Sequence, residues 1–248
     1  VLVISTSQLL AGATGVNVMS ALLGLEKVAM RYAMPGARQH AEDIVFENLN
    51  LELNPGDRLG IIGGNGSGKS TLLRLMAKIF APSSGRVWWA PDKRVSLLSL
   101  GLGFRPDLTG RENALLSCLL QGLTKRDAQN SLGAIEAFAE LDYFFDQPVK
   151  TYSTGMRARL GFATALENRS DVILIDEVLS VGDEAFRFKA TAALRDQMTE
   201  VRGVVIVSHA EQQIKHLCGS AIWLHEAGVA ATGTPEAVFQ QYNKSAPQ

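Results

Sequence analysis

Apolar and polar residues alternate over residues 22–32 and 43–53, and this period of two predicts a strand in each segment. Further along the chain, short apolar runs are separated by stretches with helical spacing, centred on TLLRLMAKIF (71–80), 184–200, the segment after 209 and 235–243. The apolar runs that predict strands are RLGIIG (58–63), RVWWA (86–90), RVSLLSL (94–100), DVILIDEV (171–178), VVIVSH (204–209) and AIWLHEA (221–227). Such alternation of strands and helices indicates an α/β fold with a largely parallel sheet.

Residues 109–170 interrupt this alternation with a block that is mostly helical in pattern. Its apolar faces lie in ALLSCLL (114–120), AIEAFAEL (134–141) and RARLGFATAL (157–166). Because strands precede and follow the block, we interpret it as a helical subdomain inserted between two halves of the α/β core.

Composition narrows the class of protein. With 248 residues, 46% hydrophobic and 20% charged, the chain is typical of one large globular domain or a domain with an inserted lobe. The net charge of -1 argues against a surface that coats nucleic acid. Cys118 and Cys218 are the two cysteines and lack metal-site spacing, which suits a reducing compartment without disulfides.

The first charged residue is Glu26, so the N-terminal stretch is uncharged. Polar residues and glycines interrupt it too often for a membrane span, and it has no basic start of the kind that secretory signals carry. We expect residues 1–18 to be a disordered leader and the domain, residues 19–248, to begin at Met19. A membrane-touching segment is the alternative.

A glycine-rich loop follows the apolar run 58–63 and precedes a helical pattern, as the phosphate-binding pattern G-x-x-x-x-G-K-[ST] requires. Glycines let backbone N–H groups turn toward a phosphate without steric clash, the lysine supplies a positive charge, and the serine hydroxyl can ligate Mg²⁺. A plain glycine turn with a solvated lysine is the alternative, which the flanking strand and helix disfavour. The loop comprises Gly63, Gly64, Asn65, Gly66, Ser67, Gly68, Lys69, Ser70 and Thr71.

Polar residues also end two of the later apolar runs. Asp176 and Glu177 end VILIDE, and His209 ends VVIVSH. Parallel strands present their carboxyl ends at one ligand-binding edge, so these side chains would reach a bound Mg-nucleotide. We expect Asp176 to hold Mg²⁺ through water, Glu177 to deprotonate the attacking water, and His209 to contact the γ-phosphate. An acidic helix start, or a structural histidine, is the alternative for each residue taken alone.

A second candidate anion site lies in KTYSTGM (150–156), just ahead of a helical pattern. Hydroxyls and a glycine at a helix N-terminus combine free N–H donors with about half a positive charge from the helix dipole. Because the chain already has a phosphate loop, we infer that Ser153, Thr154, Gly155 and Met156 serve the nucleotide of a second, head-to-tail copy of the chain.

Taken in order, these motifs resemble the ATP-binding cassette (ABC) family over roughly residues 19–243. The glycine-rich loop resembles its Walker A motif, YSTGM its signature loop, ILIDE its Walker B motif, and His209 its switch histidine. SVGD (180–183) is similar to the D-loop, which ends at Asp183, and Tyr32 is similar to the aromatic residue that stacks on adenine. The resemblance implies an ATPase with a P-loop core, an antiparallel β subdomain and an inserted helical subdomain, with ATP and Mg²⁺ as ligands.

Within that family, YSTGM, DEVLSVGD and LGLGFRPDLTGREN (100–113) resemble the ATPases that export capsule, O-antigen or teichoic-acid polysaccharides. This implies a dimer at the cytoplasmic face of the inner membrane, working with a permease dimer that handles a lipid-linked polysaccharide, and no nucleic-acid partner. The chain departs from most cassettes in one respect: it has no glutamine between residues 91 and 120 to ligate Mg²⁺. Either Ser99 supplies an oxygen ligand in its place, or water does.

Two other functions compete with transport. A cassette clamp whose ATP cycle gates protein or nucleic-acid binding usually has two ATPase units and a charged linker, and here there is one unit without a basic run. A P-loop kinase would have no use for YSTGM. We therefore expect an exporter ATPase and keep the clamp as the alternative.

Overall fold

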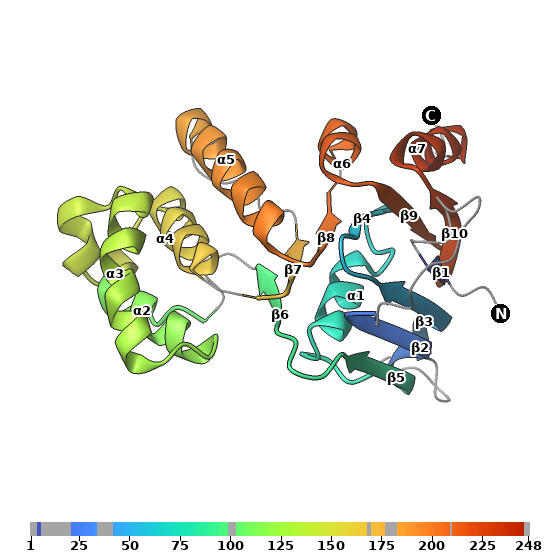
Figure 1. Ribbon diagram of the computed structural model, residues 1–248, viewed down its shortest axis with the longest axis horizontal. Coiled ribbons are helices and arrows are strands. Elements are labelled where there is room, and N and C mark those ends of the chain that lie inside the picture. The colour runs from blue at the N-terminus through green and yellow to red at the C-terminus, as the bar shows by residue number, and fades with distance from the viewer. Residues whose placement is uncertain are drawn as a thin grey trace. The chain divides into compact units, whose positions relative to one another are not determined.

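The computed structural model describes residues 4–5, 21–33, 42–98, 103–167, 170–176, 183–208 and 210–245. The chain divides into two compact units, whose elements are labelled in Figure 1. The first unit comprises Val1–Leu97, Asp171–Glu177 and Val201–Gln248, and the second comprises Leu98–Ser170 and Val178–Glu200.

The first unit contains a six-stranded sheet in the order β10-β9-β4-β8-β7-β6. Its strands are β4 (Arg58–Ile62), β6 (Val95–Leu98), β7 (Val172–Asp176), β8 (Gly203–Val207), β9 (Ser220–His225) and β10 (Gly228–Gly233). β4 pairs in parallel with β8 and with β9, β7 pairs in parallel with β8, and β10 is antiparallel to β9. The prediction of an α/β fold with a mostly parallel sheet is confirmed.

Helices cover both faces of this sheet, as the alternation of side chains along β4 shows. Leu59 belongs to the main core together with Leu72 of one helix, whereas a Cβ at Gly60 would lie 2.5 Å from Cγ2 of Ile214 on another helix. The helices of this unit are α1 (Lys69–Met76), α6 (Glu211–Leu217) and α7 (Pro235–Ser245), and Figure 1 shows α1 on one face and α6 on the other.

A second sheet of four strands has the order β1-β3-β2-β5. Its strands are β1 (Ile4–Ser5), β2 (Leu23–Ala33), β3 (Glu42–Leu53) and β5 (Ser84–Trp89). β2 is antiparallel to β3 and to β5, which confirms the antiparallel subdomain, and α1 packs against both β2 and β7. Ile4 and Ser5 pair with Leu51 and Glu52, and the other residues of the expected leader lie outside the described residues.

The second unit is helical. Its elements are α2 (Gly110–Leu120), α3 (Lys125–Ala139), the short 3₁₀ helices η2 (Asp142–Asp146) and η3 (Val149–Thr151), α4 (Thr154–Leu166) and α5 (Glu184–Glu200). The unit also extends beyond the predicted block 109–170 because it includes α5. The buried residues of α5 recur every four positions, and the first of them, Phe186, contacts Phe162 of α4 with ring centroids 6.1 Å apart.

The sequence analysis predicted neither the two-residue strand β1 nor strand β10. β10 follows β9 after a two-residue turn, Glu226-Ala227, and His225 pairs with Gly228 across it. Both turn residues have positive φ angles, 44° and 60°, as hairpin turns of this length require. Glutamate and alanine rarely adopt that conformation, so the segment carried no turn signal, and GVAATG has no clear alternation.

Candidate nucleotide-binding site

The register of the parallel strands brings three chain segments to one edge of the six-stranded sheet. Ile61 of β4 lies opposite Val207 of β8, and Val207 lies opposite Asp176 of β7. The chain therefore leaves β4 into the glycine-rich loop beside the end of β7, where Asp176 stands. This is the carboxyl edge, where open α/β sheets bind ligands.

Lys69, the first residue of α1, is the cation of the glycine-rich loop. Its side chain is buried, and its ammonium group donates hydrogen bonds to the carbonyl oxygens of Gly63 at 2.9 Å and Gly64 at 2.8 Å. These bonds hold the positive charge inside the curve of the loop. A buried charge needs such partners, and an incoming phosphate is a stronger one than a carbonyl.

Gly68 shows why the loop requires glycine at its last position before the lysine. It is the N-cap of α1 in the left-handed conformation, with φ 89°, and a Cβ there would lie 2.6 Å from Phe46 Cζ and Val45 Cγ1. Only glycine fits both constraints without strain. Gly68 thus lets the loop pack on β3 while the N–H groups of the first helical turn stay open to a ligand.

The loop, the acidic residue and an aromatic residue line one pocket of about 360 Å³, within the size range of small-molecule sites. Its lining residues are Tyr32, Asp43, Val45, Asn65, Gly66, Gly68, Lys69, Ser70, Thr71, Asp176 and Val207. Tyr32 is 40% exposed and pairs across the sheet with Asp43, so its ring is available for stacking. Asp43 and Val45 were not singled out from the sequence, since only the register of β2 on β3 places them here.

The donors for a divalent cation lie in the same pocket. Ser70 offers a hydroxyl and Asp176 a carboxylate beside Lys69. Oxygen donors of this kind, few in number and supplemented by water and phosphate oxygens, are what Mg²⁺ prefers, so these residues fit the ion.

Three predicted site residues, Glu177, His209 and Ser99, lie outside the described residues. Glu177 follows β7 directly in the sequence, and Ser208, which precedes His209, is buried at the end of β8 with its hydroxyl 2.7 Å from Gln213 Oε1. Their roles remain predictions.

The signature residues lie in the second unit, at the start of α4. Ser153 is the N-cap, with its hydroxyl accepting a hydrogen bond from the N–H of Met156 at 3.2 Å, as a serine ahead of a helical pattern predicts. Thr154 is exposed and is the first residue of the helix. Within the described part of the chain, a Cβ added to Gly155 would meet only Ser153 Oγ, at 3.8 Å, so packing among these residues does not explain the glycine.

Asp183, the last residue of the predicted D-loop, immediately precedes α5 and is bonded to the signature helix α4. Its carboxylate accepts a hydrogen bond from Phe186 N–H at 2.9 Å and pairs with the guanidinium of Arg159 on α4. The Phe186 N–H and then Arg159 lower the pKa of Asp183 below its ordinary value. Arg159 also pairs with Glu140 at 3.1 Å, and the sequence analysis did not single it out.

Comparison with known proteins places these features in a family. The family profile described as ABC transporter matches residues 46–180, which is more than half of the chain. The chain belongs to the ABC transporter family. The match begins on β3, beside the phosphate loop, and ends within the segment that follows Glu177, so it includes the loop, the signature turn and the acidic pair.

Curated relatives from this family are named as export proteins. The teichoic acids export ATP-binding protein TagH of Shouchella clausii is 35% identical over 217 residues, 88% of this chain and 60% of TagH. The O-antigen export system ATP-binding protein RfbB of Klebsiella pneumoniae is 36% identical over 203 residues, 82% of each chain. The chain spans about half the length of several other curated relatives that it matches.

Solved structures support the fold. The ATP-binding cassette MJ0796, in a dimeric post-hydrolysis state bound to ADP and phosphate, superposes with a TM-score of 0.72 over 86% of this chain and 99% of its own. At 22% identity this likeness concerns the fold alone. Within the described part of the chain, no helix has both the length and the apolar character needed to cross a bilayer.

Proposed function

We propose that this chain is an ATP-hydrolysing subunit of an ABC exporter for a lipid-linked polysaccharide. The observation that carries the ATPase part is the pocket at the carboxyl edge of the sheet. It gathers an exposed aromatic ring, a phosphate loop with a buried lysine, and oxygen donors for a divalent cation. Each matches one part of a Mg-nucleotide: base, phosphates and metal.

In this proposal different residues of the pocket bind different parts of the nucleotide. The ring of Tyr32 stacks on adenine, and the loop N–H groups and Lys69 hold the phosphates. Mg²⁺, when bound, would be held by Ser70 and, through water, by Asp176, and would offset phosphate charge. Glu177 accepts the proton of the attacking water.

The hydrolysing site is completed by the signature turn of a second copy of the chain. Among the described residues, none packs close enough to Gly155 to require a glycine there, so we attribute the requirement to the second copy's γ-phosphate. His209 reaches the same phosphate from its own subunit. Ser99, or water in its place, supplies the ligand that the missing glutamine gives in other cassettes.

Mixing two inactive variants tests the composite site. Lys69→Ala damages the phosphate loop, and Gly155→Asp places a carboxylate against the incoming phosphate. In a mixed dimer both defects fall on one site, and the other site keeps an intact loop and an intact signature turn. Single-turnover hydrolysis needs one working site, so it is expected to return to about half of the wild-type amplitude in captured heterodimers. In a random equal mixture, where about half of the dimers are heterodimers, the amplitude should be about a quarter of the wild type.

A control keeps this result specific to the trans arrangement. Because Gly155 has open space around it, Gly155→Asp alone is expected to keep the wild-type melting temperature and nucleotide affinity. If the signature turn served its own subunit, every subunit of the mixture would carry one defect. If the two variants carry different tags and the heterodimers captured from the mixture do not hydrolyse ATP, the trans role is wrong.

The export part of the proposal is supported by the relatives, which are named for teichoic-acid and O-antigen export. It places the chain peripherally at the cytoplasmic face of the inner membrane, paired with a permease dimer that handles the polysaccharide, with no nucleic acid involved. Affinity purification from detergent-solubilised membranes is expected to recover a polytopic membrane protein in equal amount. Recovery of soluble partners alone would favour the cassette clamp instead.

A further inference from the structure

The segment that immediately precedes the signature turn runs beside an earlier segment of the helical unit. Residues 105–110 and 147–152 are paired through their backbones: Lys150 N–H donates to Pro106 C=O and Val149 N–H to Leu108 C=O, both at 2.9 Å. Gly110 N–H donates to Gln147 C=O at 3.2 Å, beside an antiparallel bridge between Thr109 and Pro148. A displacement of either segment therefore carries the other with it.

The first of these segments is in turn fixed to α2. The side chain of Asn113, which is 1% exposed, accepts a hydrogen bond from Arg105 N–H at 2.7 Å and donates to the carbonyls of Arg105, Leu108 and Thr109 at 2.9–3.1 Å. Such a fully used buried amide leaves the segment little freedom. The segment LTGREN (108–113) thus has a structural role, in which Asn113 fixes the backbone of residues 105–109 to α2.

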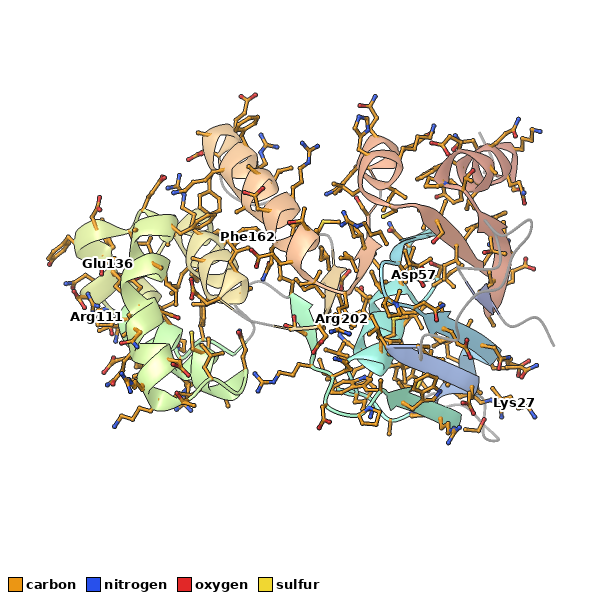
Figure 2. The ribbon with its side chains drawn as sticks, viewed as in Figure 1. Lys27, Asp57, Arg111, Glu136, Phe162 and Arg202 are labelled. Atoms are coloured by element: carbon orange, nitrogen blue, oxygen red, sulfur yellow. The ribbon has the colours of Figure 1, made fainter. Side chains whose placement is uncertain are left out.

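The second segment is fixed by Arg111. Its guanidinium donates two hydrogen bonds to the carboxylate of Asp146, at 2.6 and 3.1 Å, and one to the carboxylate of Glu136 on α3, at 3.1 Å. Figure 2 shows Arg111 and Glu136 side by side on the helices of this unit. Asp146 immediately precedes Gln147, so the pair holds the start of the second segment against α2.

Tyr152 connects these two paired segments, 105–110 and 147–152, to the signature turn. It is 4% exposed, its hydroxyl donates to the carbonyl of Phe144 at 2.6 Å, and the next residue is the N-cap Ser153. A Cβ on Gly110 would lie 2.1 Å from the Tyr152 hydroxyl oxygen, closer than any two such atoms can approach. The φ angle of Gly110 is outside the left-handed range, so this glycine is required for space and not for backbone conformation.

We propose that Gly110 and Tyr152 are positioning residues: their contact holds the Ser153 turn of one subunit where it meets the nucleotide of the other. The proposal rests on the trans role of that turn. Gly110→Ala would push Tyr152 away and move Ser153 with it. Since displacements of about 1 Å can cost on the order of 10²-fold in rate, ATPase activity should fall about tenfold or more.

The experiment compares four variants at a temperature where each is folded by circular dichroism: Gly110→Ala, Tyr152→Phe, the double variant, and Gly133→Ala. Gly133 lies on α3 with open space around it and serves as the control. Nucleotide affinity, a property of the other unit, should stay within about twofold for all four, as expected of sites that share no contacts. Gly133→Ala should also keep its ATPase rate, which a change in helix stability alone would not alter.

Rescue by the second substitution is the sharpest readout. Tyr152→Phe removes the oxygen that lies 2.1 Å from the new methyl group, which is the most severe overlap; Phe145 C=O at 2.9 Å and Cζ of residue 152 at 3.2 Å remain as smaller overlaps. The double variant should therefore hydrolyse ATP faster than the two single effects combined would predict, a non-additive result typical of residues in contact. A double variant that is insoluble, or as slow as the two single effects combined, overturns the proposal.

This outcome is separable from the trans assignment. If mixed Lys69→Ala and Gly155→Asp subunits regain activity while Gly110→Ala behaves like Gly133→Ala, the trans role stands and the positioning role is wrong. If mixing restores nothing while the Gly110 and Tyr152 effects are coupled, the positioning contact stands and the trans role is wrong.

Discussion

Substitution of Gly68 by alanine separates the glycines that the fold needs from those that a nucleotide needs. The alanine would have to keep a φ angle of 89°, and its methyl group would lie 2.6 Å from Phe46, a core residue with no exposed surface. Gly64 lies in the same loop with open space around it and a φ angle outside the left-handed range. Gly64→Ala is thus the matched control.

The size of the effect follows from two costs. A left-handed conformation costs a residue with a Cβ roughly 1–2 kcal/mol, and overpacking a core costs typically about 1–3 kcal/mol. Together they predict a loss of about 2–5 kcal/mol in the free energy of unfolding. At about 2–4 °C per kcal/mol for a chain of this size, the melting temperature should fall by roughly 4–20 °C.

Thermal unfolding without nucleotide is the assay, because it excludes effects on binding. Gly64→Ala should stay within about 1 kcal/mol of the wild type, as exposed glycine substitutions without strain do. Equal melting temperatures for Gly68→Ala, Gly64→Ala and the wild type would show that the close approach of Gly68 to Phe46 does not constrain the loop, and the argument would fail.

Three further predictions concern the chemistry and its pH range. Glu177→Gln should keep ATP binding but lower turnover about 10²-fold or more, as loss of a general base does, and near-normal hydrolysis would reject the assignment. Lys69→Ala should weaken ATP binding about tenfold or more by calorimetry, because it removes a buried cation from the loop, and unchanged affinity would contradict this role. Burial raises the pKa of Tyr152 to about 12, so between pH 10 and 12 the folded chain keeps a proton that the unfolded chain loses. The stability that this proton contributes is present below pH 10 and should be lost as the pH rises from 10 to 12, lowering the free energy of unfolding by at most about 3 kcal/mol. Urea unfolding across this range should show a weaker pH dependence for Tyr152→Phe than for the wild type. An equal pH dependence of the two proteins would contradict the prediction.

Features that depend on neighbours in the chain were predictable from the sequence. The phosphate loop joins a strand to a helix, and Ser153 caps a helix that starts at Thr154, because glycine conformation and side-chain capping act over a few residues. Periodicity located α5 at residues 184–200 for the same reason. The family resemblance followed from these local motifs, since their order along the chain is itself a property of sequence.

Tertiary structure decided which of these local features meet. Tyr32 reaches the pocket of Lys69 through the register of β2 on β3, and the same pairing adds Asp43, which no motif contains. β10 forms through an unfavourable turn at Glu226-Ala227, whose cost is met by pairing with β9. Gly110 and Tyr152 are 42 positions apart in the sequence, and nothing local marks them as a contact. Register and packing arise from the whole set of buried surfaces at once, so a pattern read along the chain predicts the parts but not which distant side chains will touch.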